Sequence, residues 1–178
     1  APAYVNRLLT AGWKVAICDQ LEAPVAGKLV RRGLTRILTP GTALEDSQLD
    51  SRRGNYLAAL SWDKHGWHAS WLDVSTADFR LATDQNPQRL LPLLHSVSPR
   101  EVILPEGLEP PPEFREAFEV FMQGRAVSRL PGWNFEGAAG ARLVAQTLAV
   151  HGLAGFGLTE EHPALGAAGA VLGYVTDS

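Results

Sequence analysis

The sequence has little of what several protein classes require. Its 178 residues contain one cysteine, so no internal disulfide can form. No run approaches the roughly 18 consecutive apolar residues that span a bilayer, and the first residues lack the order of a signal peptide. Charged residues make up only 20% of the chain and hydrophobic residues 46%, which excludes a disordered chain. These absences predict a folded, cytoplasmic protein without membrane contact.

The single cysteine, Cys18, follows the apolar residues Val15, Ala16 and Ile17. A small thiol in such a run is expected to be buried and inert. No histidine lies near it in the sequence, so we expect no catalytic role for Cys18.

Charge is divided unequally along the chain. Residues 1–54 carry eight basic and five acidic residues, which gives a net charge of +3. Residues 55–178 carry a net charge of −6, so the whole chain has −3. Such a change of sign predicts two units with different partners, the basic one being the candidate for contact with phosphate.

The first part of the chain predicts an incomplete α+β unit. Helical spacing of apolar residues covers 3–11, and strand patterns cover 13–18 and 34–39. Two strands and one helix do not close a core. The turn at 40–42 leads into a polar run that is typical of a connector. The predicted division is a first domain at 1–42, a linker at 43–54 and a second domain at 55–178.

Closely spaced strands dominate the second unit. Three antiparallel strands followed by alternating helices and strands predict an α/β fold, in which helices cover a mixed sheet. This order matches the ribonuclease H-like architecture. Asn86 is expected to cap the first helix of this unit, and Pro92 to kink that helix or delay its start. The expected elements are strands 56–62, 67–74 and 79–82, a helix after 86, strand 100–104, helix 113–121, strand 126–130, and helices 138–151 and 164–175.

Catalytic and cofactor templates fail on spacing. Gly27-Lys28 lacks the first glycine and the Ser or Thr of a phosphate loop, and the five histidines are scattered. We therefore expect no catalytic residues, metal or cofactor in this chain. The alternative is a metal-dependent nuclease of ribonuclease H-like fold with Asp73 as first ligand. Asp73 and Asp78 flank a tight turn, however, and short carboxylates there more often bond to the turn backbone.

Glycine and alanine recur in two late runs, 137–141 and 166–170. The runs are similar, but close helix packing explains small residues there better than an internal repeat does.

Four basic residues lie between positions 23 and 39 without an acidic one: Lys28, Arg31, Arg32 and Arg36. They stand on a loop that enters a strand, from which long side chains can reach a nucleic-acid backbone. Charge alone leaves a solvated basic hairpin equally open.

Several short motifs, in one order, resemble the MutS family of bacterial DNA mismatch repair proteins. The first group resembles the end of the mismatch-recognition domain, and the second resembles the connector domain that follows it. The motifs are Tyr4 to Leu9, Val15 to Gln20 and Arg36 to Thr42, then Asn55 to Ala59, Leu72 to Thr76, Trp133 to Glu136, Gly155 to Gly157 and Ala168 to Tyr174. One departure is Ala77, where the family commonly has glycine.

The resemblance implies a protein that binds mismatched double-stranded DNA, forms a homodimer, binds and hydrolyses ATP with magnesium, and recruits MutL at the bacterial nucleoid. The family's Phe-x-Glu wedge and its ATPase domain are expected outside this chain, so the chain itself is expected to be a non-catalytic module with weak DNA affinity. The resemblance places basic DNA contacts at Lys28, Arg31 and Arg32.

The connector is expected to offer a surface to MutL. We assign this surface to the exposed face of helix 138–151, including Arg142 and Gln146. The opposite face carries Val144 and Leu148, which are expected in the core.

Overall fold

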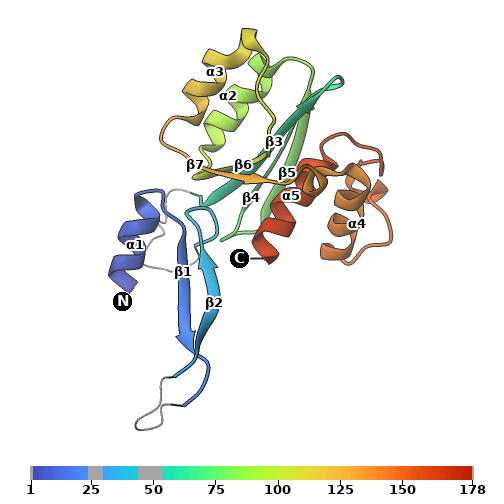
Figure 1. Ribbon diagram of the computed structural model, residues 1–178. Helices are drawn as coiled ribbons and strands as arrows, with labels where there is room; N and C mark the ends of the chain where they lie inside the picture. Colours follow the sequence, from blue (N-terminus) through green and yellow to red (C-terminus); the bar gives the residue numbers. More distant parts are fainter. Residues whose placement is uncertain (1, 24–29, 44–53, 178) are drawn as a thin grey trace.

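The computed structural model describes residues 2–23, 30–43 and 54–177 (Figure 1). The strands in these residues form a two-stranded sheet, β1-β2, and a five-stranded sheet in the order β5-β4-β3-β6-β7. The elements are α1 (Pro2–Thr10), β1 (Val15–Gln20), β2 (Arg32–Leu38), β3 (Tyr56–Asp63), β4 (Gly66–Asp73), β5 (Asp78–Asp84), α2 (Pro87–Val97), β6 (Glu101–Pro105), η1 (Pro112–Phe114), α3 (Arg115–Met122), β7 (Ala126–Leu130), η2 (Gly132–Phe135), α4 (Gly137–Thr147), η3 (Ala154–Phe156) and α5 (Leu165–Thr176).

The hairpin region consists of α1, β1 and β2. The two strands pair antiparallel, with a register shift between Ile17 and Cys18. The first strand begins at Val15, later than predicted, because Trp13 still donates its backbone N–H to Leu8 at the end of α1. The prediction that Cys18 is buried is wrong: its side chain is exposed. No described helix covers both faces of this two-stranded sheet, so positions such as Cys18 stay open to solvent.

The sheet unit consists of the five-stranded sheet and the helices around it. Strands β3, β4 and β5 form an antiparallel meander, and β6 and β7 run parallel to β3. Helices α2 and α3 lie on one face and α4 and α5 on the other (Figure 1). The predicted mixed α/β fold is confirmed. Among the residues that the structure describes, no helix has the length and apolar character to cross a membrane.

Alternation along β3 supplies both cores of the sheet unit. Leu57 and Ala59 face α4 and α5, whereas Ala58 and Leu60 face α2 and α3, and all four side chains are fully buried. A strand that is buried on both faces needs apolar residues at consecutive positions, which explains the uninterrupted apolar run from Leu57 to Leu60.

Glycines allow α4 and α5 to pack closely. A Cβ at Gly140 would lie 1.9 Å from the Leu165 carbonyl oxygen, and one at Gly169 would lie 2.6 Å from the Gly140 Cα. Only a residue without a side chain fits such an approach. The prediction that small residues in these two runs serve helix packing is confirmed.

Two details of the helices differ from prediction. Helix α4 ends at Thr147, because Ala149 adopts a left-handed conformation with φ 53° and closes the helix end. Leu148 is therefore 40% exposed, and its expected core position is wrong. Helix α2 begins at Pro87 without delay and contains Pro92 in its interior, while Asn86 caps it by accepting the Gln88 N–H over 2.9 Å, as predicted.

Candidate nucleic-acid interface

Arg32 is in the last strand pair, at the end of the β1-β2 hairpin that points away from the five-stranded sheet (Figure 1), Arg31 directly precedes it, and Arg36 lies within β2. Beyond the last strand pair, Gln20 with Arg32, the Leu21 N–H donates to the Arg31 carbonyl over 2.9 Å. The two chain segments therefore stay paired as far as Arg31. Lys28, the third residue of the predicted DNA-binding set, lies outside the described residues.

The arginines of the hairpin are available to a partner. Arg31, Arg32 and Arg36 are exposed, and none of them forms an ion pair within the part of the chain that the structure describes. Unpaired guanidinium groups on a projecting hairpin can donate to the phosphate oxygens of a nucleic acid without first breaking an internal contact.

Two carboxylates lie near these arginines, which the sequence argument did not include. Asp19 on β1 stands opposite Gly33 and accepts the Thr35 hydroxyl over 2.7 Å. Glu22 accepts the Arg31 backbone N–H over 3.1 Å. Asp19 lies on β1 and Glu22 lies two residues beyond its end, so a search of positions 23–39 could not include them. They reduce the net positive charge of the hairpin.

The predicted partner-binding residues occupy a different part of the molecule. Arg142 and Gln146 are exposed on α4, four residues apart and therefore on one side of the helix. Val144 is 2% exposed and faces the core, as predicted. The structure does not bring this pair together with the arginines of the hairpin (Figure 1).

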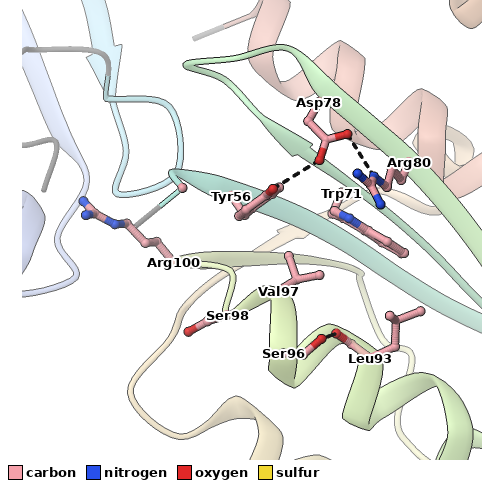
Figure 2. A pocket seen from close by; sticks show the side chains of 10 residues that line it. Tyr56, Trp71, Asp78, Arg80, Leu93, Ser96, Val97, Ser98 and Arg100 are labelled. Carbon is pink, nitrogen blue, oxygen red and sulfur yellow. Dashed lines mark hydrogen bonds and ion pairs between the residues drawn. The ribbon is translucent and has the colours of Figure 1, made fainter. Parts of the chain in front are cut away.

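A hollow of about 800 Å³ opens beside β5 and the end of α2 (Figure 2). Within it Asp78 accepts the Tyr56 hydroxyl over 3.2 Å and the Arg80 Nε over 2.9 Å. The Arg80 guanidinium holds the pKa of Asp78 below its ordinary value, while burial and the Asp78 hydrogen bond raise that of Tyr56. These groups satisfy one another, and the Arg100 side chain points away from them.

Sequence reasoning missed this set, although a signal was present. Asp78 and Arg80 are two residues apart on one strand and so share a face. Tyr56 reaches them because the register aligns it with Asp73, and Asp73 with Asp78. Counting the register of the predicted meander would have placed the three residues in one region.

Asp73, the residue of the nuclease alternative, is engaged by its own turn. Its Oδ1 accepts the Ser75 backbone N–H over 2.9 Å and the Ser75 hydroxyl over 2.6 Å. The carboxylate therefore bonds to the turn as predicted, whereas Asp78 binds Tyr56 and Arg80 instead. No group of three histidine, cysteine or acidic side chains suited to a metal occurs in residues 2–23, 30–43 and 54–177. The nuclease alternative gains no support.

The turn also explains the departure at Ala77. This residue has φ 59°, in the left-handed region that favours glycine, and its N–H donates to the Asp73 carbonyl over 2.8 Å. A glycine at this position would adopt the same turn without the steric cost that alanine carries.

The fold and the hairpin together define a two-part α/β protein, in which an exposed basic hairpin adjoins a helix-covered mixed sheet. Comparison with known families places it more narrowly. Residues 1–47 match MutS domain I and residues 55–178 match MutS domain II. The chain belongs to the MutS family.

Similar curated proteins carry one name. The chain is 37% identical to the DNA mismatch repair protein MutS of Myxococcus xanthus and 39% identical to those of Symbiobacterium thermophilum and Syntrophobacter fumaroxidans. The alignments cover 98–100% of this chain but 20% of each relative. The chain thus spans about a fifth of the length of the curated relatives it matches.

Proposed function

We propose that this chain is the DNA-contacting and connecting part of a mismatch repair protein, in which Arg31, Arg32 and Lys28 contact the DNA backbone. The observation that carries the proposal is the exposure of Arg31 and Arg32, without ion pairs to described residues, on a hairpin that projects from the sheet unit. The part acts by binding and has no turnover of its own. A DNA partner puts its site of action at the bacterial nucleoid, in the cytoplasm.

The sheet unit serves in this proposal as the connector, with a ribonuclease H-like fold. Its strand order supports that assignment, since three antiparallel strands are followed by two strands parallel to the first. The longer protein would bind ATP with magnesium elsewhere and act as a homodimer. The connector joins its DNA-binding and ATPase ends.

The test is the salt dependence of DNA binding. Each phosphate contact adds roughly one unit to the slope of log K against log salt. The double variant Arg31→Gln/Arg32→Gln should lose about two units of slope and most of the affinity for a labelled duplex, measured by fluorescence anisotropy. Arg142→Gln is the matched control, since it removes an exposed arginine from α4 and should leave the slope unchanged. An unchanged slope in the double variant contradicts the proposal.

Mismatch selectivity is not expected of these contacts. Backbone contacts position a protein on DNA but carry no sequence information, so matched and mismatched duplexes should bind this chain equally. Strong preference for a mismatch would show that this chain contacts bases, and would contradict the proposal that it contacts only the DNA backbone.

MutL is the proposed protein partner of the connector, at the side of α4 that carries Arg142 and Gln146. The exposure of both residues supports this choice. Arg142→Glu in the full-length protein should weaken association with MutL in a pull-down, whereas unchanged association would reject this surface.

A further inference from the structure

A buried carboxylate lies where the hairpin region meets the sheet unit. Glu101, the first residue of β6, has no exposed surface. It stands opposite Leu57 and so shares the sheet face that α5 covers. Burying a charge is costly unless hydrogen-bond donors surround it. The groups that donate to Glu101 therefore show which elements its carboxylate joins.

Two donors belong to the sheet unit. The Tyr174 hydroxyl, on α5, donates to Glu101 Oε1 over 2.6 Å, and the Ser128 hydroxyl, on β7, donates to the same oxygen. Burial and then the Glu101 carboxylate raise the pKa of Tyr174, so its hydroxyl keeps the donated proton. These bonds tie β6 to its neighbour β7 and to α5.

The third donor comes from the segment that leaves the hairpin. The Gly41 backbone N–H donates to Glu101 Oε2 over 3.0 Å. A Cβ at Gly41 would lie 2.9 Å from Leu57 Cδ1 and 3.0 Å from Glu101 Cβ, so a larger residue here would force the Leu57 or Glu101 side chain to move. One carboxylate oxygen thus binds the sheet unit, and the other binds the end of the hairpin region.

Other contacts hold the same segment against the sheet unit. Thr39 is 1% exposed, and Thr39 and Thr42 each accept the other's backbone N–H on the side-chain oxygen over 3.2 Å. The buried Asn55 donates its amide to the Ala43 carbonyl over 2.8 Å. These hydrogen bonds fix the conformation of residues 39–43 independently of the bond to Glu101.

Tyr174 adds a second link between the two parts. Its ring faces the Lys14 ammonium, which lies 5.5 Å from the ring centroid, and Thr39 bonds to its hydroxyl. Lys14 and Thr39 flank the two strands of the hairpin, one before β1 and one after β2. Both ends of the hairpin are therefore connected to one tyrosine, which itself bonds to Glu101.

We propose that Glu101 is the positioning residue that fixes the direction of the β1-β2 hairpin relative to the five-stranded sheet. The orientation is a property of the chain without DNA, so this inference goes beyond the proposed function. Its consequence for DNA recognition rests on that function: the arginines of the hairpin are held at a set angle to the connector.

The test is a distance measurement between the two parts. Cys18 is exposed and is the only cysteine, so one added cysteine, Glu119→Cys on α3, completes a pair of spin labels for pulsed electron resonance. The labelled chain should give one narrow distance distribution. Glu101→Ala removes both acceptor oxygens, so the Gly41 N–H and the two hydroxyl donors lose their partner and the narrow peak should be lost.

Two further variants keep the test decisive if Glu101→Ala does not fold. Gly41→Ala places a Cβ against Leu57 and Glu101, which should displace the Gly41 N–H from Oε2. The narrow peak should therefore also be lost. Ser128→Ala removes one donor from Oε1, leaves the Gly41 bond in place and should preserve the peak. Circular dichroism reports that each variant is folded.

The inference is overturned by a narrow, unshifted peak in folded Gly41→Ala or Glu101→Ala, or by equal broadening in Ser128→Ala. Because no DNA is present, failure of the chain to bind DNA would reject the proposed function and leave this result standing. Conversely, Arg31→Gln/Arg32→Gln should not change the distance.

Discussion

The hairpin region and the sheet unit contain strands of similar length and opposite burial. Every residue of β4 after the first is buried, whereas no residue of β1 is. Leu34 on β2 is 57% exposed and Leu57 on β3 is fully buried. The difference lies in what covers the strands, because helices lie on both faces of the larger sheet, whereas α1 is the one helix of the described residues beside the hairpin (Figure 1). Strand pattern alone sets neither burial nor stability.

The largest expected effect is the difference in stability loss between two leucine-to-alanine variants, one in each region. Leu57→Ala should lower the free energy of unfolding by about 2–5 kcal/mol, because it leaves a cavity in a packed core. Leu34→Ala should cost about 0.5 kcal/mol or less, as surface substitutions do. Urea unfolding followed by tryptophan fluorescence measures both, since four of the five tryptophans lie in the sheet unit. Equal losses would contradict the contrast between the two regions.

The next effect concerns the packing of α4 on α5. Alanine in place of a helical glycine is ordinarily favourable by about 1 kcal/mol. Gly140→Ala should instead destabilise by about 1–3 kcal/mol, because its Cβ would overlap the Leu165 carbonyl oxygen. Gly173→Ala is the control: its Cβ would meet only Leu143 Cδ2 at 3.8 Å, so it should stabilise the chain. Thermal unfolding of both variants checks the reversal of sign.

A smaller effect depends on pH and concerns Asp73. Burial opposes ionisation of its carboxyl, but hydrogen bonds from Ser75 outweigh burial and hold its pKa below the ordinary value. The stabilisation is therefore present above the unfolded pKa of about 3.9 and is lost as pH falls through the lower, folded pKa. Asp73→Asn should cost about 1 kcal/mol at pH 7, because bonds to a charged acceptor are stronger. The cost should shrink as the pH drops below 4, and a cost independent of pH would exclude this origin.

The smallest effect concerns the turn after β4. Ala77→Gly should stabilise the chain by up to about 1 kcal/mol, because the left-handed conformation costs alanine about 1–2 kcal/mol and glycine loses part of that gain as entropy on folding. Ala82→Gly, in extended β5, should destabilise by a similar amount. Thermal unfolding of the pair distinguishes relief of strain at Ala77 from a general response to glycine.

Much of the fold could be predicted from local pattern. The Asn86 cap, the meander and the alternating elements that follow it are each encoded within a few residues. The sequence did not predict the end of α4 at Thr147, because the left-handed position that closes the helix is Ala149. A glycine there would have indicated the helix end. The burial of Cys18 was missed because an apolar run predicts a strand but does not show what covers it.

The candidate sites divide in the same way. Exposure of Arg31, Arg32, Arg142 and Gln146 followed from their polar character. The role of Glu101 could not be derived from its neighbours in sequence, because its donors lie 27, 60 and 73 residues away. Interactions over such separations depend on the topology of the sheet, which short patterns do not specify.

The central claim is that DNA contact belongs to the hairpin and not to the sheet unit. The most direct measurement is a titration of the isotope-labelled 178-residue chain with a DNA duplex, followed by amide chemical shifts. The account predicts shifts that concentrate at Gln20, Leu21, Arg31 and Arg32, weaken with added salt, and leave β3 to α5 unchanged. Shifts concentrated on the sheet unit, with a silent hairpin, would contradict it.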